Sequence, residues 1–86
     1  MVNTRKVKAR YIELGLTQKI IADKIGLDYT ALNLKLNNKR RLYIDEVAKL
    51  CDILQIKTAG ELHDFFGIDF LLVSNIRENA KELGGV

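Results

Sequence analysis

The stretch TQKIIADKIGLDYTALNLKLNNKR, residues 17–40, decides the fold of this 86-residue chain. Within it Leu32, Leu34 and Leu36 alternate with polar residues, a pattern typical of a half-buried strand. The segment is nevertheless rich in leucine, alanine and lysine, and positions 28–38 contain no valine or isoleucine to favour a strand. Asp28 is also a strong helix N-cap. We therefore predict a helix with Leu32 and Leu36 facing the core and Leu34 outward, unless Leu34 covers another part of a small core.

A second helix is expected directly before this one. Thr17 can cap residues 18–25, and Gly26 can adopt the left-handed conformation that ends them. Ala22 is small where two such helices would cross, and isoleucines flank it on the same face. Two helices joined by a short glycine-containing turn, with polar residues on the free face of the second, are typical of the helix-turn-helix motif.

Three further helices are expected around this pair. Residues 3–14 have helical composition and are followed by Gly15. Asp45 and Glu46 belong in the first turn of the next helix, whose apolar residues recur every three or four positions. A short last helix begins at Thr58 or Gly60 and ends near position 66. The sequence thus predicts an all-α domain: a compact bundle of about five short helices with a central helix-turn-helix.

Residues 1–67 are expected to form this domain, and residues 68–86 a C-terminal extension. The apolar segment 68–73 has two interpretations. It is a strand that pairs with a second subunit, followed by a helix over 75–83 capped by Ser74, or residues 69–83 form one helix. We favour the single helix. In either case a segment this apolar must be buried, either against its own bundle or against another chain.

Charge is distributed unevenly along the chain. Residues 1–44 hold ten Lys/Arg and three Asp/Glu, a net charge of +7, whereas residues 45–86 hold four and eight, a net charge of −4. A basic half of this kind suits a phosphate-binding face, although solubility alone can also explain it. No apolar run reaches the length of a membrane span and no signal peptide is evident, so a cytoplasmic, nucleoid-associated protein is expected.

Catalytic chemistry is not expected. The chain has one histidine, His63, and one cysteine, Cys51, which falls on the apolar face of its helix. Neither has the neighbours that a nucleophile, a general base or a metal site needs. No glycine-rich phosphate loop is present. We therefore predict no enzyme activity, no cofactor, no metal and no small-molecule substrate.

The spacing of the helix-turn-helix residues resembles that of the phage Cro and repressor family. The matching positions are Gln18, Ile21, Ala22, Ile25, Gly26, Leu27 and Leu32. The resemblance continues through LKLNNKRRLYIDEVAKLCDILQI, residues 34–56, and covers roughly residues 5–66. Two positions depart from the family pattern. Asn38 stands where many members have glycine, and Lys35 stands at a position that is often apolar, with Leu36 taking the apolar role one residue later.

This resemblance implies a regulator that binds double-stranded DNA, with the helix at about residues 28–37 entering the major groove. Base contacts are then expected from Tyr29, Thr30, Asn33 and Leu34. Phosphate contacts are expected from Thr17, Gln18, Lys35, Asn37, Asn38, Lys39 and Arg40. Two alternatives remain open at this point: a protein-interaction module of the same fold, such as an antirepressor or adaptor, and the antitoxin of a toxin-antitoxin pair.

A homodimer is expected, at least on DNA. One recognition helix touches only about four or five base pairs, which gives a single copy too little discrimination. The expected dimer contacts are Phe66, Phe70, Leu71, Leu72 and Val73. The alternative is that this segment folds back as a sixth helix of its own bundle.

Overall fold

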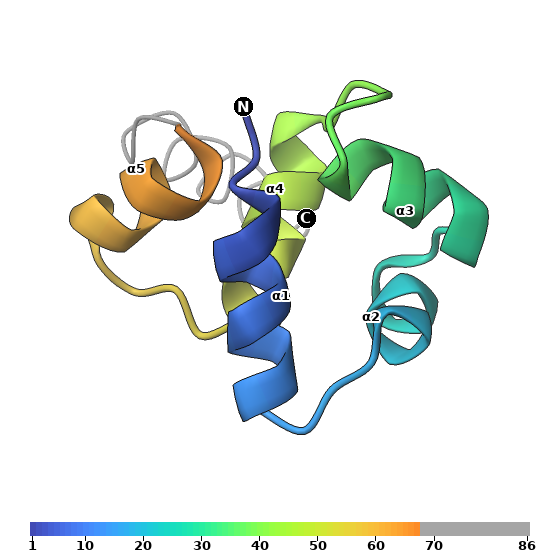
Figure 1. Cartoon of the computed structure of the whole chain (residues 1–86), viewed down its shortest axis with the longest axis horizontal. Coiled ribbons are helices and arrows are strands. Elements are labelled where there is room, and N and C mark those ends of the chain that lie inside the picture. Colours follow the sequence, from blue (N-terminus) through green and yellow to red (C-terminus); the bar gives the residue numbers. More distant parts are fainter. Residues whose placement is uncertain (68–86) are drawn as a thin grey trace, which may run out of the picture.

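The computed structural model describes residues 1–67, which form five helices (Figure 1). In chain order they are α1 (Thr4–Glu13), α2 (Gln18–Ile25), α3 (Tyr29–Leu36), α4 (Ile44–Ile53) and α5 (Ala59–Phe66). All regular secondary structure in this part of the chain is helical, which confirms the predicted all-α class. The leucine alternation at positions 32–36 therefore lies on a helix.

The ends of the central helices are set by short-range signals in the sequence. Thr17 Oγ1 accepts a hydrogen bond from the Ile20 N–H at 3.2 Å, and Asp28 Oδ1 accepts one from the Ala31 N–H at 2.7 Å. These side chains satisfy backbone donors that the first helical turn leaves unpaired. Gly26 ends α2 at φ +77°, where a side chain would be strained. The predicted bounds of the helix-turn-helix are thereby confirmed.

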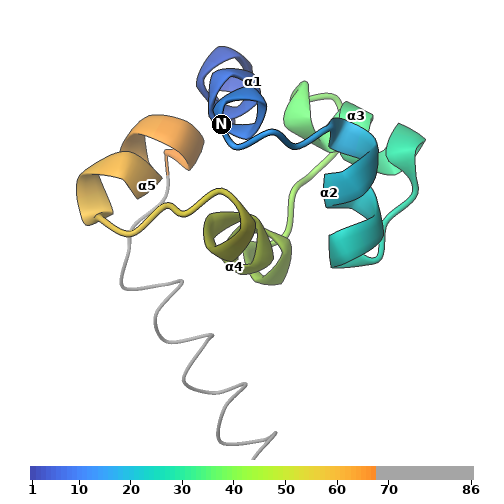
Figure 2. The same ribbon diagram turned by 90° about the horizontal axis from the view of Figure 1, so that it is seen from below.

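The helices are arranged in two groups around one core. α1 and α5 lie on one side, the α2–α3 pair lies on the other, and α4 lies between these two pairs (Figures 1 and 2). α2 packs against both α3 and α4, while α1 packs against α5. The most deeply buried side chains come from all five helices and the end of α4; they are Val7, Ile21, Leu32, Val47, Leu50, Leu54 and Phe66. The core thus anchors α3 through Leu32 and leaves its opposite side outward.

Arg10 fastens α1 to the segment that leaves α4. Its Nη1 donates to the backbone oxygens of Leu54 at 2.9 Å and Gln55 at 3.2 Å. Gln55 has a left-handed backbone, φ +56°, as the chain turns toward α5. The Arg10 guanidinium also lies 5.1 Å from the centre of the Phe65 ring. One side chain therefore joins α1, the end of α4 and α5.

A short N-terminal strap, residues 1–4, crosses from α5 to the end of α3. The Asn3 N–H donates to the Phe65 carbonyl at 2.7 Å, and Thr4 Oγ1 donates to the Leu36 carbonyl at 2.6 Å. Val2, within this strap, is itself buried and belongs to the core. The strap therefore connects the helix-turn-helix side of the molecule with α5.

Predictions for the C-terminal segment have different outcomes. Phe66 was expected to contact a second subunit, but it is only 1% exposed and belongs to the core of its own bundle. That prediction is wrong, because α5 turns Phe66 inward. Phe70, Leu71, Leu72 and Val73, with the strand and helix alternatives for them, lie outside the described residues. Within residues 1–67 no helix is long and apolar enough to cross a membrane.

Candidate nucleic-acid interface

The outer side of α3 carries the four residues predicted to read bases. Tyr29 and Thr30 in its first turn are exposed, and Asn33 and Leu34 one turn later are half-buried. Helical spacing places Tyr29 beside Asn33 and Thr30 beside Leu34. Leu34 faces away from the core side occupied by Leu32, as predicted, although neighbouring atoms cover part of it.

A hollow of about 260 Å³ lies between α1 and this side of the helix-turn-helix. Its lining combines apolar residues with many hydrogen-bonding groups: Thr4, Val7, Lys8, Tyr11, Gln18, Tyr29, Asn33, Leu36 and Asn37. Four of the predicted contact residues, Gln18, Tyr29, Asn33 and Asn37, meet here. Residues from α1, α2, α3 and the turn after α3 thus converge on one concave surface.

Gln18 is the first residue of α2 and lines this hollow. Its Nε2 is buried and has no hydrogen-bond partner among the described residues. An unsatisfied buried amide is uncommon in folded proteins and costs free energy. A ligand oxygen in the hollow would satisfy it, and the positive end of the α2 dipole favours an anionic oxygen there.

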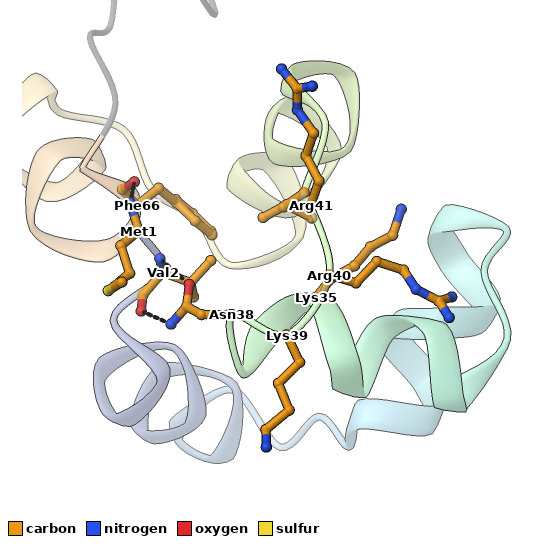
Figure 3. A pocket seen from close by; sticks show the side chains of 9 residues that line it. Met1, Val2, Lys35, Asn38, Lys39, Arg40, Arg41 and Phe66 are labelled. Atoms are coloured by element: carbon orange, nitrogen blue, oxygen red, sulfur yellow. Dashed lines mark hydrogen bonds between the residues drawn. The ribbon is translucent and has the colours of Figure 1, made fainter.

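The loop after α3 presents a basic cluster, Lys39, Arg40 and Arg41, all exposed. The Leu34 carbonyl holds the loop in place by accepting from the N–H groups of Lys39 at 2.9 Å and Arg40 at 3.2 Å. The three charged side chains extend in different directions, although they border the same 390 Å³ hollow (Figure 3). This divergence suits a row of separate phosphates better than one small anion.

Comparison with protein families matches residues 6–66 to the Cro/C1-type HTH DNA-binding domain. The chain belongs to this family. Comparisons with curated proteins and with solved structures found no match. The predicted family is therefore confirmed, and α2 and α3 lie within the matched Cro/C1-type domain.

Asn38 serves the Cro/C1-type domain differently from its predicted role. It adopts a left-handed backbone, φ +61°, as its place at a glycine position predicts. Its side chain pairs with the strap: Asn38 Oδ1 accepts from the Val2 N–H, and Asn38 Nδ2 donates to the Val2 carbonyl, both at 2.9 Å (Figure 3). Because both polar atoms of this amide bond the Val2 backbone, the geometry argues against a phosphate contact by the Asn38 side chain.

Lys35 is a clear correction to the predicted phosphate contacts. It is only 6% exposed, and its ammonium is bound by the carboxylate of Glu46 on α4. A buried ammonium held in this way does not reach a phosphate on the surface. The remaining predicted phosphate contacts, Thr17, Gln18, Asn37, Lys39 and Arg40, stay predictions. Thr17, Asn37, Lys39 and Arg40 are exposed and Gln18 lines the hollow.

Two residues of α1 that sequence reasoning missed also line the hollow of the Cro/C1-type domain, Lys8 and Tyr11. Burial raises the pKa of the Tyr11 hydroxyl above its usual value, and neighbouring Tyr29 adds to the rise. The phenol therefore stays protonated at neutral pH and can donate to a phosphate oxygen. Their spacing of three residues places Lys8 and Tyr11 on the same face of a helix in the basic half of the chain. This spacing is the signal by which the sequence could have indicated two further phosphate donors.

Proposed function

We propose that this chain is a sequence-specific transcriptional regulator of the phage Cro and repressor type. The main support is the unsatisfied Nε2 of Gln18, at the start of α2 and inside a hollow shared with the recognition helix. A DNA phosphate at this position supplies the missing acceptor and places α3 beside the major groove. Positioning of the duplex and reading of its sequence are then separate tasks.

Phosphates are bound on both sides of the recognition helix. Gln18 and Thr17 lie before it, Asn37, Lys39 and Arg40 lie after it, and Lys8 and Tyr11 add donors from α1. The α3 side chains between these groups read the bases. Asn33 is suited to a bidentate pair with adenine, and Leu34 to contact with a thymine methyl group. Tyr29 and Thr30 contact the neighbouring base edges.

Selection from a pool of randomised duplexes tests this proposal directly. The full chain should enrich one related set of sites, and its affinity for the selected duplex should fall steeply with added salt because bound counterions are released. Asn33→Ala should reduce the preference at one base pair, by about 1 to 3 kcal/mol of binding free energy. Failure to enrich any sequence, together with salt-independent binding, would reject DNA regulation in favour of a protein-interaction module.

We also propose that the regulator acts as a homodimer on a two-fold symmetric site, with residues 1–67 as the DNA-binding domain and residues 68–86 as the extension that joins the copies. The apolar residues Phe70, Leu71, Leu72 and Val73 are the candidate contacts. Sedimentation of the full chain, and of a chain ending at Gly67, tests this division. Loss of the dimer with the helical circular-dichroism signal retained supports it; a monomer in both cases, with and without the selected duplex, contradicts it.

A further inference from the structure

The recognition helix is attached to α4 by a buried ion pair. Lys35 Nζ donates to Glu46 Oε1 at 2.8 Å and to Oε2 at 2.7 Å. The two side chains are only 7% and 11% exposed. The Lys35 ammonium also lies 4.9 Å from the centre of the Tyr43 ring. A charged group therefore shares the buried side of α3 with Leu32 and Leu36.

Glu46 also fixes the start of α4. Its Oε1 accepts from the Tyr43 N–H at 2.9 Å, which caps the first turn of α4. The Arg41 guanidinium lies 5.9 Å from the centre of the same Tyr43 ring. One carboxylate thus contacts both the recognition helix and the end of the basic loop that follows it.

We infer that Lys35 and Glu46 are positioning residues, which set the rotation of α3 and thereby the directions in which Thr30, Asn33 and Leu34 face the bases. This inference rests on the proposed function. An apolar contact tolerates small rotations of a helix, whereas an ammonium held by two carboxylate oxygens beside an aromatic ring is directional. Replacing buried ion pairs by neutral residues often leaves stability unchanged. The contribution inferred for this pair is therefore one of arrangement and not of stability.

A set of three variants separates positioning from stability. Lys35→Met leaves a buried carboxylate without its partner, and Glu46→Gln leaves a buried ammonium; each should lower the thermal midpoint. The double variant K35M/E46Q removes both charges while the glutamine oxygen can still accept from Tyr43. Its midpoint should return close to that of the wild type. Lys49→Met, at an exposed lysine of α4, is the matched control.

DNA binding of these variants is measured with the duplex selected by the wild-type chain and with a random duplex of equal length. The double variant should lose about tenfold of its preference for the selected duplex, as expected when a base contact is misdirected. Its affinity for the random duplex and its salt dependence should match those of the wild type, because Lys35 contacts no phosphate. Lys49→Met should keep the full preference.

Two results would overturn the inference. The first is a double variant that keeps the wild-type preference for the selected duplex. The second is a double variant whose slope of log affinity against log salt falls by about one unit, because that change marks a lost phosphate contact. If the double variant does not fold, Lys35→Arg provides the test, since it keeps the charge and changes the geometry. It should still reduce the preference, and an unchanged preference refutes positioning. If the wild-type chain itself shows no preference for any duplex, the proposed function is rejected, and the inference that rests on it is rejected as well.

Discussion

Arg10 on α1 and Glu61 on α5 form an ion pair between helices that begin 55 positions apart, with Arg10 Nη2 lying 2.6 Å from Glu61 Oε2. Glu61 Oε1 accepts in addition from the Lys57 N–H at 3.4 Å. Because the Arg10 guanidinium donates to it and the backbone of Lys57 adds a second donor, the pKa of Glu61 lies below its usual value. The pair links the two ends of the described bundle.

The Glu61 contribution to stability should depend on pH. A lowered pKa in the folded state means that the carboxylate stabilises the fold at neutral pH, and that this contribution is lost as pH falls through the lowered pKa. Since the Glu61 side chain is 32% exposed, solvent screens the pair and the effect is small. Glu61→Gln should lower the thermal midpoint by a few degrees at pH 7, and this difference should vanish in acid. Glu13→Gln, at a carboxylate that is 76% exposed, is the control and should change little at either pH.

The bonds between Asn38 and Val2 should be measurable in unfolding experiments. Asn38→Gly keeps the left-handed backbone but removes both bonds, which should lower the free energy of unfolding by about 1 kcal/mol. Asn38→Ala should cost about 1 kcal/mol more, because alanine is strained at positive φ. Urea titration gives both values. A glycine variant as stable as the wild type would mean that the side-chain bonds contribute nothing.

Ala22 leaves no room for a larger side chain. It is 1% exposed on α2, which packs against both α3 and α4. Ala22→Leu should overpack this contact and cost about 1 to 3 kcal/mol of stability or displace α3. Ala9→Leu on the exposed side of α1 is the matched control and should be tolerated. Equal thermal unfolding of the Ala22 variant and the wild type would contradict the packing described here.

Arg40 should contribute to DNA affinity without contributing to sequence preference. Arg40→Ala should weaken binding to the selected and random duplexes alike and reduce the slope of log affinity against log salt by about one unit. Lys57→Ala, at an exposed cation in the segment between α4 and α5, is the control. Identical slopes for the Arg40 variant and the wild type would remove Arg40 from the interface.

Gln18→Leu separates binding from folding most sharply. It deletes a buried amide nitrogen that has no partner in the part of the chain that the structure describes, so stability should stay the same or rise. DNA affinity should fall by about 1.5 to 3 kcal/mol, the range for a hydrogen bond to a charged acceptor. Fluorescence anisotropy and thermal unfolding measure the two effects. Unchanged affinity would exclude Gln18 as a phosphate ligand.

The helix-turn-helix was predictable from the sequence because its signals are local. Thr17 and Asp28 each bond a backbone N–H three residues later, and Gly26 acts through its own backbone angles. Such signals need no knowledge of tertiary contacts. The same holds for the outward direction of Leu34, which follows from helical periodicity once the helix is assigned.

The errors concern side chains whose partners are distant in the sequence. Lysine is among the residues least often buried, so a sequence pattern places Lys35 on the surface unless the carboxylate eleven residues later is known to face it. Asn38 is bound by a backbone 36 residues away, and Phe66 is buried in the core cluster. In each case tertiary contacts determine the role of the side chain. Residue type and spacing alone predicted a different role.

The N-terminal strap also has a consequence for the order in which the domain folds. The hydrogen bond from Asn3 to Phe65 spans 62 residues, whereas α2 and α3 are neighbours in the sequence as well as in space. Local helix pairs lose little chain entropy when they form, but contacts across the whole domain must await the docking of the last helix. We therefore expect the strap to close last, and the Asn3 amide hydrogen to gain protection from solvent exchange only after the amides of α2 and α3 are already protected.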